Sequence, residues 1–244
     1  MSWRYVSEER KLSEGRGKGR GVDYKPWIRF GETGSDGTGC IQPDWKHGRG
    51  IQCLSQGELL AYALLRWEDD VEDVLEQFPL MNLSATNGIA RRLGYAPSDH
   101  GRSRMTTDFL VIRSGRRVDA YSIKVSRSAV EVQKGDTKKV REAKQRICEL
   151  QEIEQVYWEA QGIPWHQWFS DELDTVKARN ILDVVSRYRW ESPMDDFAVV
   201  RYMLAHKIIG VDMSKPIDYE RLIAALKGGT QWNALLENSS SLLA

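Results

Sequence analysis

Three charged residues interrupt segments that are otherwise apolar, and their side chains could do chemistry together. Glu58 lies in LSQGELLAYALLRW, Asp108 in MTTDFLVI and Lys124 in VDAYSIKV. Carboxylates bind Mg²⁺ through hard oxygens, and the metal activates water and neutralises charge that builds up on a phosphate. A lysine can orient or deprotonate that water, or stabilise the negative transition state. The three residues are therefore a candidate site for metal-assisted attack on a phosphate.

Each of these residues also has a purely structural interpretation. Ser55 stands three residues before Glu58, which is the spacing of a capping box at a helix start. Asp108 and Lys124 could form a cross-strand ion pair on a half-exposed sheet. Local sequence leaves both interpretations open, and only the joint occurrence of the three residues favours the site.

Glu154 is a fourth charged residue at a position that periodicity places inside. It falls at helical spacing between Leu150 and Tyr157. A buried carboxylate needs a partner, and Lys124 is a candidate. The edge of a partly exposed helix face is an equally good interpretation.

The elements that must position these residues are predicted in the order helix, strand, strand, strand, helix, strand. Their expected ranges are 54–67, 71–78, 105–112, 118–125, 137–161 and 165–169, with a turn at 114–117 joining the two central strands. In such a hairpin, Asp108 and Lys124 reach neighbouring positions near one end of the sheet. Residues 81–104 are expected to form an irregular, exposed excursion, and residues 31–50 a loop or loose hairpin.

Charge is strongly segregated along a chain whose formal net charge is zero. Residues 102–146 carry 13 basic and 5 acidic residues, whereas residues 149–244 carry 9 basic and 15 acidic ones. A basic patch is the electrostatic footprint of a polyanion site, although a solvated helix face gives the same count. The polar, Gly- and Arg-rich residues 1–25 are expected to be a flexible basic arm that lies on phosphates.

Composition excludes several classes of protein. No apolar run approaches the roughly 20 residues of a membrane span, and the first residues lack the apolar stretch of a secretory signal. Three cysteines without a CxxC pattern are typical of reduced thiols in a cytosolic protein. A zinc site from Cys40, His47 and Cys53 is a weaker alternative, because three ligands at irregular spacing match no common zinc pattern.

Five stretches of the chain resemble the TnsA family, the endonuclease subunits of heteromeric cut-and-paste transposases. They are EGRGKGRGVDYKPW, LSQGELLAYALLRWEDDVEDVLEQFPL, MTTDFLV, YSIKV and LQEIEQVYWEAQGIPW, in family order from Glu14 to about Phe169. The resemblance implies an α/β fold with a restriction-endonuclease-like PD-(D/E)xK core, αβββαβ with a mixed sheet. It also implies three parts: the arm 1–25, a catalytic domain 26–170, and a helical or winged-helix-like partner-docking domain 171–244.

The resemblance also assigns roles to residues. Glu58 and Asp108 become metal-binding carboxylates, the Ile123 carbonyl a backbone metal ligand, and Lys124 the active-site lysine. Glu154 matches a further acidic catalytic position. Ser122 is a departure, since the wider superfamily has an acidic residue there. DNA contacts are expected from six basic residues: Arg16, Lys18, Arg20, Arg102, Arg104 and Arg127.

The implied reaction is Mg²⁺-dependent hydrolysis of DNA at the 5′ ends of a transposon, with Mn²⁺ able to substitute. The implied partners are transposon-end DNA, a TnsB-type transposase that cuts the 3′ ends and a TnsC-type ATPase regulator, in the bacterial cytoplasm and without a membrane. Two alternatives stay open: a catalytically silent DNA-binding or adaptor subunit, favoured by Ser122, and a stand-alone restriction or repair nuclease of the same fold.

Overall fold

The computed structural model describes residues 6–32, 38–189, 191, 194–227, 229–230 and 232. The chain forms two compact units, Met1–Leu173 and Asp174–Ala244. Each unit is considered by itself below.

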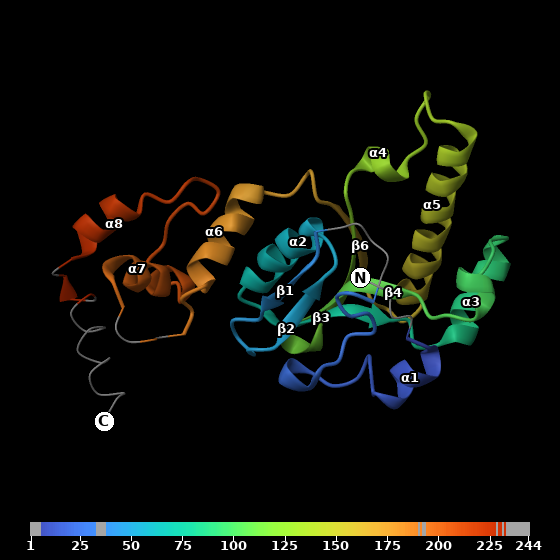
Figure 1. Ribbon diagram of the computed structural model, residues 1–244, viewed down its shortest axis with the longest axis horizontal. Helices are drawn as coiled ribbons and strands as arrows, with labels where there is room; N and C mark the ends of the chain where they lie inside the picture. The colour runs from blue at the N-terminus through green and yellow to red at the C-terminus, as the bar shows by residue number, and fades with distance from the viewer. Residues whose placement is uncertain are drawn as a thin grey trace. The chain divides into compact units, whose positions relative to one another are not determined.

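A four-stranded mixed sheet is the centre of the first unit (Figure 1). Its strands are β3 (Val71–Pro79), β4 (Thr106–Arg113), β5 (Val118–Lys124) and β6 (Trp165–Phe169), hydrogen-bonded in that order. Strand β4 is antiparallel to both of its neighbours, β3 and β5, and β6 runs parallel to β5. All four strands that the sequence predicts are therefore confirmed, within one or two residues at their ends.

Helices cover both faces of this sheet. Helix α2 (Gln56–Trp67) contacts β3, β4 and β5 on one face, where the Tyr62 and Phe109 rings lie 6.4 Å apart. On the other face, helix α5 (Lys138–Glu159) packs Ile153 into a buried cluster with Leu75 and Leu110 of the strands. Adjacent residues of β4 face opposite helices because side chains alternate along a strand.

The link from β5 to β6 completes the predicted core. Parallel neighbours cannot be joined by a tight turn, so the chain crosses over through α4 (Arg127–Val130) and α5. The sequence α2, β3, β4, β5, α5, β6 is the αβββαβ order of the restriction-endonuclease-like fold, which is therefore confirmed.

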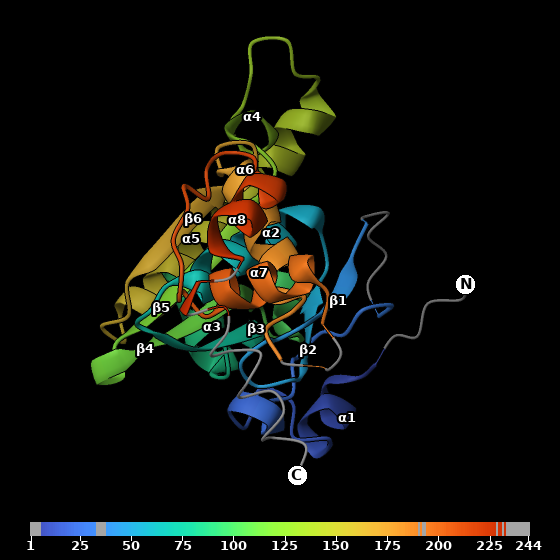
Figure 2. The same ribbon diagram turned by 90° about the vertical axis from the view of Figure 1, so that its left-hand side faces the viewer.

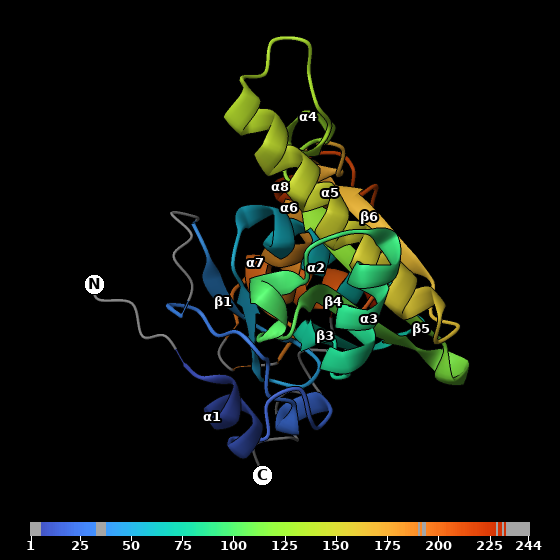
Figure 3. The same cartoon turned by 90° about the vertical axis from the view of Figure 1, so that its right-hand side faces the viewer.

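The expected excursion 81–104 is instead partly a buried helix, α3 (Leu83–Leu93). The Asn82 side chain accepts a hydrogen bond from the Ala85 amide at its start, and Gly94 ends it with φ +77°. Ile89 and Ala90 pack into the cluster that α5 covers, and Figure 3 shows α3 beside α5. The capping residues and the apolar stripe of this helix are local signals in the sequence, so the expectation of an irregular, exposed excursion was wrong for residues 83–93. A 3₁₀ turn, η2 (Ser98–Gly101), follows it.

The N-terminal segment is folded against the sheet in its described part, unlike the expected flexible arm; residues 1–5 lie outside that part. It contains α1 (Glu8–Ser13) and the 3₁₀ turn η1 (Gly21–Asp23). Gly17 has φ +76°, and a Cβ there would lie 2.4 Å from the Pro79 ring. Gly17 therefore permits a close backbone approach to β3.

Two short antiparallel strands, β1 (Cys40–Pro43) and β2 (Gly50–Cys53), form a hairpin. It begins within residues 31–50, where a loop or loose hairpin was expected, and extends beyond them to Cys53. The 3₁₀ turn η3 (Ser114–Arg116) joins β4 to β5 as predicted.

The second unit contains α6 (Thr175–Val185), α7 (Asp196–Ala205) and α8 (Tyr219–Leu226), seen together in Figure 2. Ile181 and Val184 of α6 and Met203 of α7 are fully buried. Within its described residues this unit has helices and no strand, so it shows no wing of a winged helix. Across the described part of the whole chain, no helix is both long and apolar enough to cross a membrane.

Candidate active site

Glu58 lies in the first turn of α2, where it is both a cap partner and a buried acid. Ser55 is the N-cap: its hydroxyl accepts from the Glu58 amide at 3.1 Å and donates to the Glu58 carboxylate at 3.0 Å. The Leu54 amide donates to the other carboxylate oxygen at 2.9 Å. The structural interpretation of Glu58 is thus correct, and it fixes the carboxylate in a defined orientation beside the end of the sheet.

Asp108 and Lys124 are neighbours across β4 and β5, as their spacing predicts. The Lys124 Nζ lies 3.6 Å from the Asp108 Oδ2, and the Ile123 amide donates to that same oxygen at 2.6 Å. Both side chains remain partly exposed, 29% for Lys124 and 18% for Asp108. The pair is therefore held in place by the Ile123 amide, and both side chains remain partly accessible to a ligand.

The Lys124 ammonium has two further acceptors on its own strand. It donates to the Ser122 hydroxyl at 3.1 Å and to the Ile123 carbonyl at 3.2 Å. Ser122 is buried. The residue that departs from the superfamily pattern therefore positions the lysine in this structure.

Glu154 of α5 is buried at the same end of the sheet. Its carboxylate accepts a hydrogen bond from the Thr107 hydroxyl of β4. The partner that the structure supplies is thus Thr107 rather than the expected Lys124, while the Glu154 charge still acts on the lysine at longer range.

The electrostatics of these groups are strongly coupled. Burial, and secondarily the charge of Asp108, raise the pKa of Glu58 to about 8 and that of Glu154 to about 7. Burial lowers the pKa of Lys124, but Asp108, Glu154 and Glu58 together raise it above its ordinary value. If all three carboxyl groups were ionised, the site would carry excess negative charge, because Lys124 supplies a single positive charge.

This donor set fits a divalent cation. Glu58, Asp108 and the Ile123 carbonyl offer hard oxygen ligands, which Mg²⁺ prefers. The pKa of Glu58 is raised because its carboxyl group is buried and lies near the charge of Asp108. A bound cation would offset both effects by favouring the ionised carboxylate.

Gln77 is a residue of this region that the sequence analysis missed. It is buried in β3, and its amide nitrogen lies 3.3 Å from the Glu58 Oε2. The side-chain Oε1 of Gln77 accepts a hydrogen bond from the Thr106 hydroxyl. The backbone of Gln77 has φ +47°, which is unfavourable for a residue with a side chain. The strand sequence VEDVLEQFP contains four polar residues, so the glutamine among them gave no distinctive signal.

The six basic residues predicted to contact DNA lie in different settings. Arg16 is buried and bound to Glu14 and Glu32, so this assignment is corrected: its guanidinium cannot reach a phosphate. Ion pairs also hold Arg102 to Asp99, Arg104 to Glu8 and Arg127 to Glu172. Lys18 and Arg20 are exposed, and their side chains form no ion pair within the described residues.

A second group of potential metal ligands lies near the β1–β2 hairpin and consists of Asp44, His47 and Asp73. Asp44 already lies 3.2 Å from the buried guanidinium of Arg66, and His47 lies 3.4 Å from Asp73. A cation here would have to compete with that guanidinium, so we interpret the group as a charge network.

The structure does not bring Cys40, His47 and Cys53 together as a zinc site. Cys40 and Cys53 are cross-strand partners in β1 and β2. His47 lies instead with Asp44 and Asp73, and the ligand groups found in the described part of the chain contain no cysteine.

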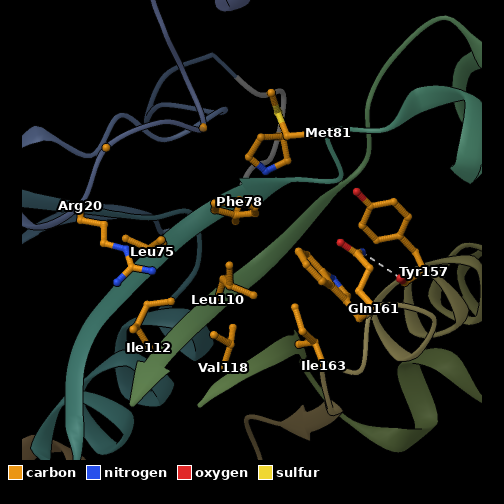
Figure 4. Close-up of a pocket in the computed structure, with 14 residues that line it drawn as sticks. Arg20, Leu75, Phe78, Met81, Leu110, Ile112, Val118, Tyr157, Gln161 and Ile163 are labelled. Carbon is orange, nitrogen blue, oxygen red and sulfur yellow. Dashed lines mark hydrogen bonds between the residues drawn. The ribbon is translucent and has the colours of Figure 1, made fainter. Parts of the chain in front are cut away.

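A separate apolar cavity of about 450 Å³ lies between the N-terminal segment and the α5 face of the sheet (Figure 4). Sheet residues such as Leu75 and Leu110 line it, together with Tyr157 and Ile163, and Arg20 lies at its side. Glu58, Asp108, Lys124 and Glu154 are not among its lining residues. The cavity is therefore distinct from the carboxylate–lysine cluster.

The fold is that of a restriction-endonuclease-like domain, with a carboxylate–lysine cluster at one end of its sheet. Residues 68–168 match the family model of the TnsA-like endonuclease N-terminal domain. The chain is also 35% identical over 182 residues to the transposon Tn7 transposition protein TnsA of Escherichia coli. That alignment covers 74% of this chain and 62% of the relative.

These two findings support the assignment of this chain to the TnsA family, and the resemblance predicted from its sequence is thereby confirmed. The matched range contains Asp108, Lys124 and Glu154, whereas Glu58 lies before it. The chain spans less than two thirds of its relative's length.

Proposed function

We propose that this chain is the endonuclease subunit of a transposase and hydrolyses a phosphodiester of DNA at the 5′ ends of the transposon. The observation that carries the proposal is the approach of Lys124 Nζ to within 3.6 Å of Asp108 Oδ2 beside the buried Glu58, on a fold of the TnsA family. Water adds to phosphorus and the P–O3′ bond breaks, which leaves a 5′-phosphate and a 3′-hydroxyl.

Different residues of the chain would bind the metal ion, orient the water and transfer a proton. Glu58, Asp108 and the Ile123 carbonyl would hold a divalent ion, Mg²⁺ or in its place Mn²⁺. When bound, that ion activates water and neutralises charge on the phosphate. Lys124, directed by Ser122, orients the attacking water or stabilises the negative charge on the phosphate oxygens. Glu154, whose pKa is about 7, can accept or release a proton near neutral pH.

The partners in this proposal follow from the family. The chain acts on transposon-end DNA together with a TnsB-type transposase that cuts the 3′ ends, and a TnsC-type ATPase regulates both. The similar Escherichia coli protein is a transposition protein, which supports this assignment. The acidic, helical second unit is proposed to dock these partners, with residues 26–170 as the catalytic domain.

Strand-specific nicking of a transposon-end plasmid in Mg²⁺ tests the proposal. The wild-type protein would be compared with Asp108→Ala and Lys124→Ala, each with and without partner subunits and each checked for folding by circular dichroism. We expect cuts at the 5′ ends that both variants lose. Unchanged cutting in both folded variants would remove Asp108 and Lys124 from the site.

The second candidate function is a DNA-binding or adaptor subunit without catalysis, which Ser122 favours because a hydroxyl is a poorer Mg²⁺ ligand than a carboxylate. Absence of nicking by wild type, even with partners, would favour this function. A stand-alone nuclease of the same fold would instead cut without partners and without preference for transposon ends.

A further inference from the structure

Residues 125–148, which we name the α4–α5 projection, leave the sheet beside Lys124 and lead back to it just before Glu154. They comprise α4, a loop and the first half of α5. Figure 1 shows this part of the chain extending beyond the sheet. Within α5 the buried residues begin only at Gln151, and in α4 only Val130 is buried. The projection is therefore solvent-exposed on most sides and is connected at both ends to the candidate site.

The projection is strongly basic. It contains seven Lys and Arg residues and three Asp and Glu residues. Several of its cations already have acidic neighbours, as in the pairs of Lys144 with Asp136 and Arg127 with Glu172. The side chains of Lys134, Lys139 and Arg141 are exposed and form no ion pair in the described part of the chain.

The placement of these cations works against the stability of α5 itself. The N-terminus of a helix carries partial positive charge and favours acidic residues. The first turn of α5 has none, and it begins instead with Lys138 and Lys139. An anion bound here would interact favourably with both the ammonium groups and the exposed amides of the first turn.

The chemistry of the projection fits a nucleic acid better than a protein partner. Protein interfaces are enriched in aromatic residues and depleted in lysine, whereas residues 125–148 contain no aromatic residue. Phosphate backbones are bound by Lys and Arg on an accessible surface. The exposed first half of α5 is about 18 Å long, roughly half a turn of a DNA duplex.

We propose that the α4–α5 projection binds the phosphate backbone of the duplex whose scissile phosphate reaches Lys124, with Lys134, Lys139 and Arg141 as its contacts. This inference rests on the proposed nuclease function for the identity of the DNA. It replaces part of the predicted contact set, since Arg16 is buried and three others are ion-paired.

The test measures binding without cleavage. A fluorescent duplex carrying a transposon end is titrated in EDTA with the full chain and with Lys134→Gln/Lys139→Gln/Arg141→Gln, across a series of salt concentrations. We expect affinity to fall at least tenfold and the slope of log K against log salt to decrease by about 2 to 3, since each lost phosphate contact removes about 0.9.

The matched control is Arg91→Gln/Arg92→Gln/Arg116→Gln, which removes three exposed arginines that lie outside the projection and form no ion pair in the described residues. It should bind like the parent protein. Equal losses in both triple variants, no loss in the projection variant, or no binding by the parent would each overturn the proposal. Lost partner capture with unchanged DNA affinity would also overturn it and assign the projection to a protein contact.

Binding and nicking separate the two proposals. If the wild-type protein does not nick DNA but the projection variant loses DNA affinity, the projection binds DNA and the nuclease proposal fails. If the wild-type protein nicks DNA and the projection variant binds DNA normally, the nuclease proposal is supported and the proposed role of the projection is wrong.

Discussion

Glu58 takes part in the cap of α2 and also belongs to the candidate site, and the capping hydrogen bonds orient its carboxylate for the site. The Ser55 hydroxyl and the Leu54 amide hold both of its carboxylate oxygens before any ion binds. A side chain fixed in this way loses little conformational entropy on binding a metal. The cap is therefore part of the preorganisation of the site.

Metal binding should be measurable as stability at the residue scale. We expect Mg²⁺ in large excess to raise the melting temperature of the wild-type protein at pH 8 by about 2–4 °C relative to EDTA. Glu58→Gln and Asp108→Asn should abolish this shift, because each removes a charged ligand. Differential scanning fluorimetry measures it, with the exposed Glu142→Gln as a control that keeps the shift. A full shift in both ligand variants would contradict the metal assignment.

Gln77 is expected to position Glu58 at the cost of backbone strain. Gln77→Ala and Gln77→Gly both remove the amide that contacts Glu58, so both should reduce nicking by roughly tenfold. Glycine tolerates the φ of +47° without strain. We therefore expect Gln77→Gly to be about 1 kcal/mol more stable than Gln77→Ala in urea unfolding. Equal stabilities would show that the backbone here is unstrained.

At the scale of elements, the β1–β2 hairpin is attached to the sheet through buried charge. Arg49 of the connecting turn lies 2.5 Å from Glu76 of β3 and also donates to the Val74 carbonyl. Burial raises the pKa of Glu76 to about 6, and Arg49 opposes that rise. The hairpin leads directly into the Ser55 cap, so this ion pair supports the placement of Glu58.

Arg49→Met should therefore destabilise the protein in a pH-dependent way. A carboxyl whose folded pKa exceeds its unfolded value costs nothing below the unfolded value and its full penalty above the folded one. Losing Arg49 raises the folded pKa of Glu76 further, so the variant should be destabilised by about 3–5 kcal/mol at pH 8 and by less at pH 5. Urea unfolding at both pH values checks this. An equal loss at both would exclude Glu76 as the cause.

At the scale of the whole molecule, the boundary between the two units predicts separable folding. Each unit has its own buried residues, for example Phe109 in the first and Met203 in the second. We expect a fragment of residues 1–173 to unfold cooperatively and to show the same Mg²⁺-dependent stabilisation as the full chain. Calorimetry of the fragment and the full chain tests this. A fragment without a cooperative transition would show that the second unit is needed for the fold of the first.

The sequence determined the secondary elements that have long, regular patterns. The β-branched and apolar residues of 105–112 and 118–125, and the helical period of 137–161, are local signals, and the structure contains β4, β5 and α5 there. It also indicated Glu58, Asp108 and Lys124 as polar residues that an apolar core does not require, and their element order predicted the fold. Their catalytic roles remain a prediction.

Only the tertiary structure decided what depends on contacts distant in the chain. Arg16 resembles any basic residue of a polar segment until its burial against Glu32 is seen, and Gln77 gains meaning only through its approach to Glu58. The sequence around α3 contains a cap at Asn82, an apolar stripe and Gly94 at its end, but only the structure shows that Ile89 and Ala90 of this stripe are buried in the cluster beside α5. Periodicity is encoded within a few residues, whereas burial and pairing arise when separate elements meet, which is why the sequence predicted the elements and not these partners.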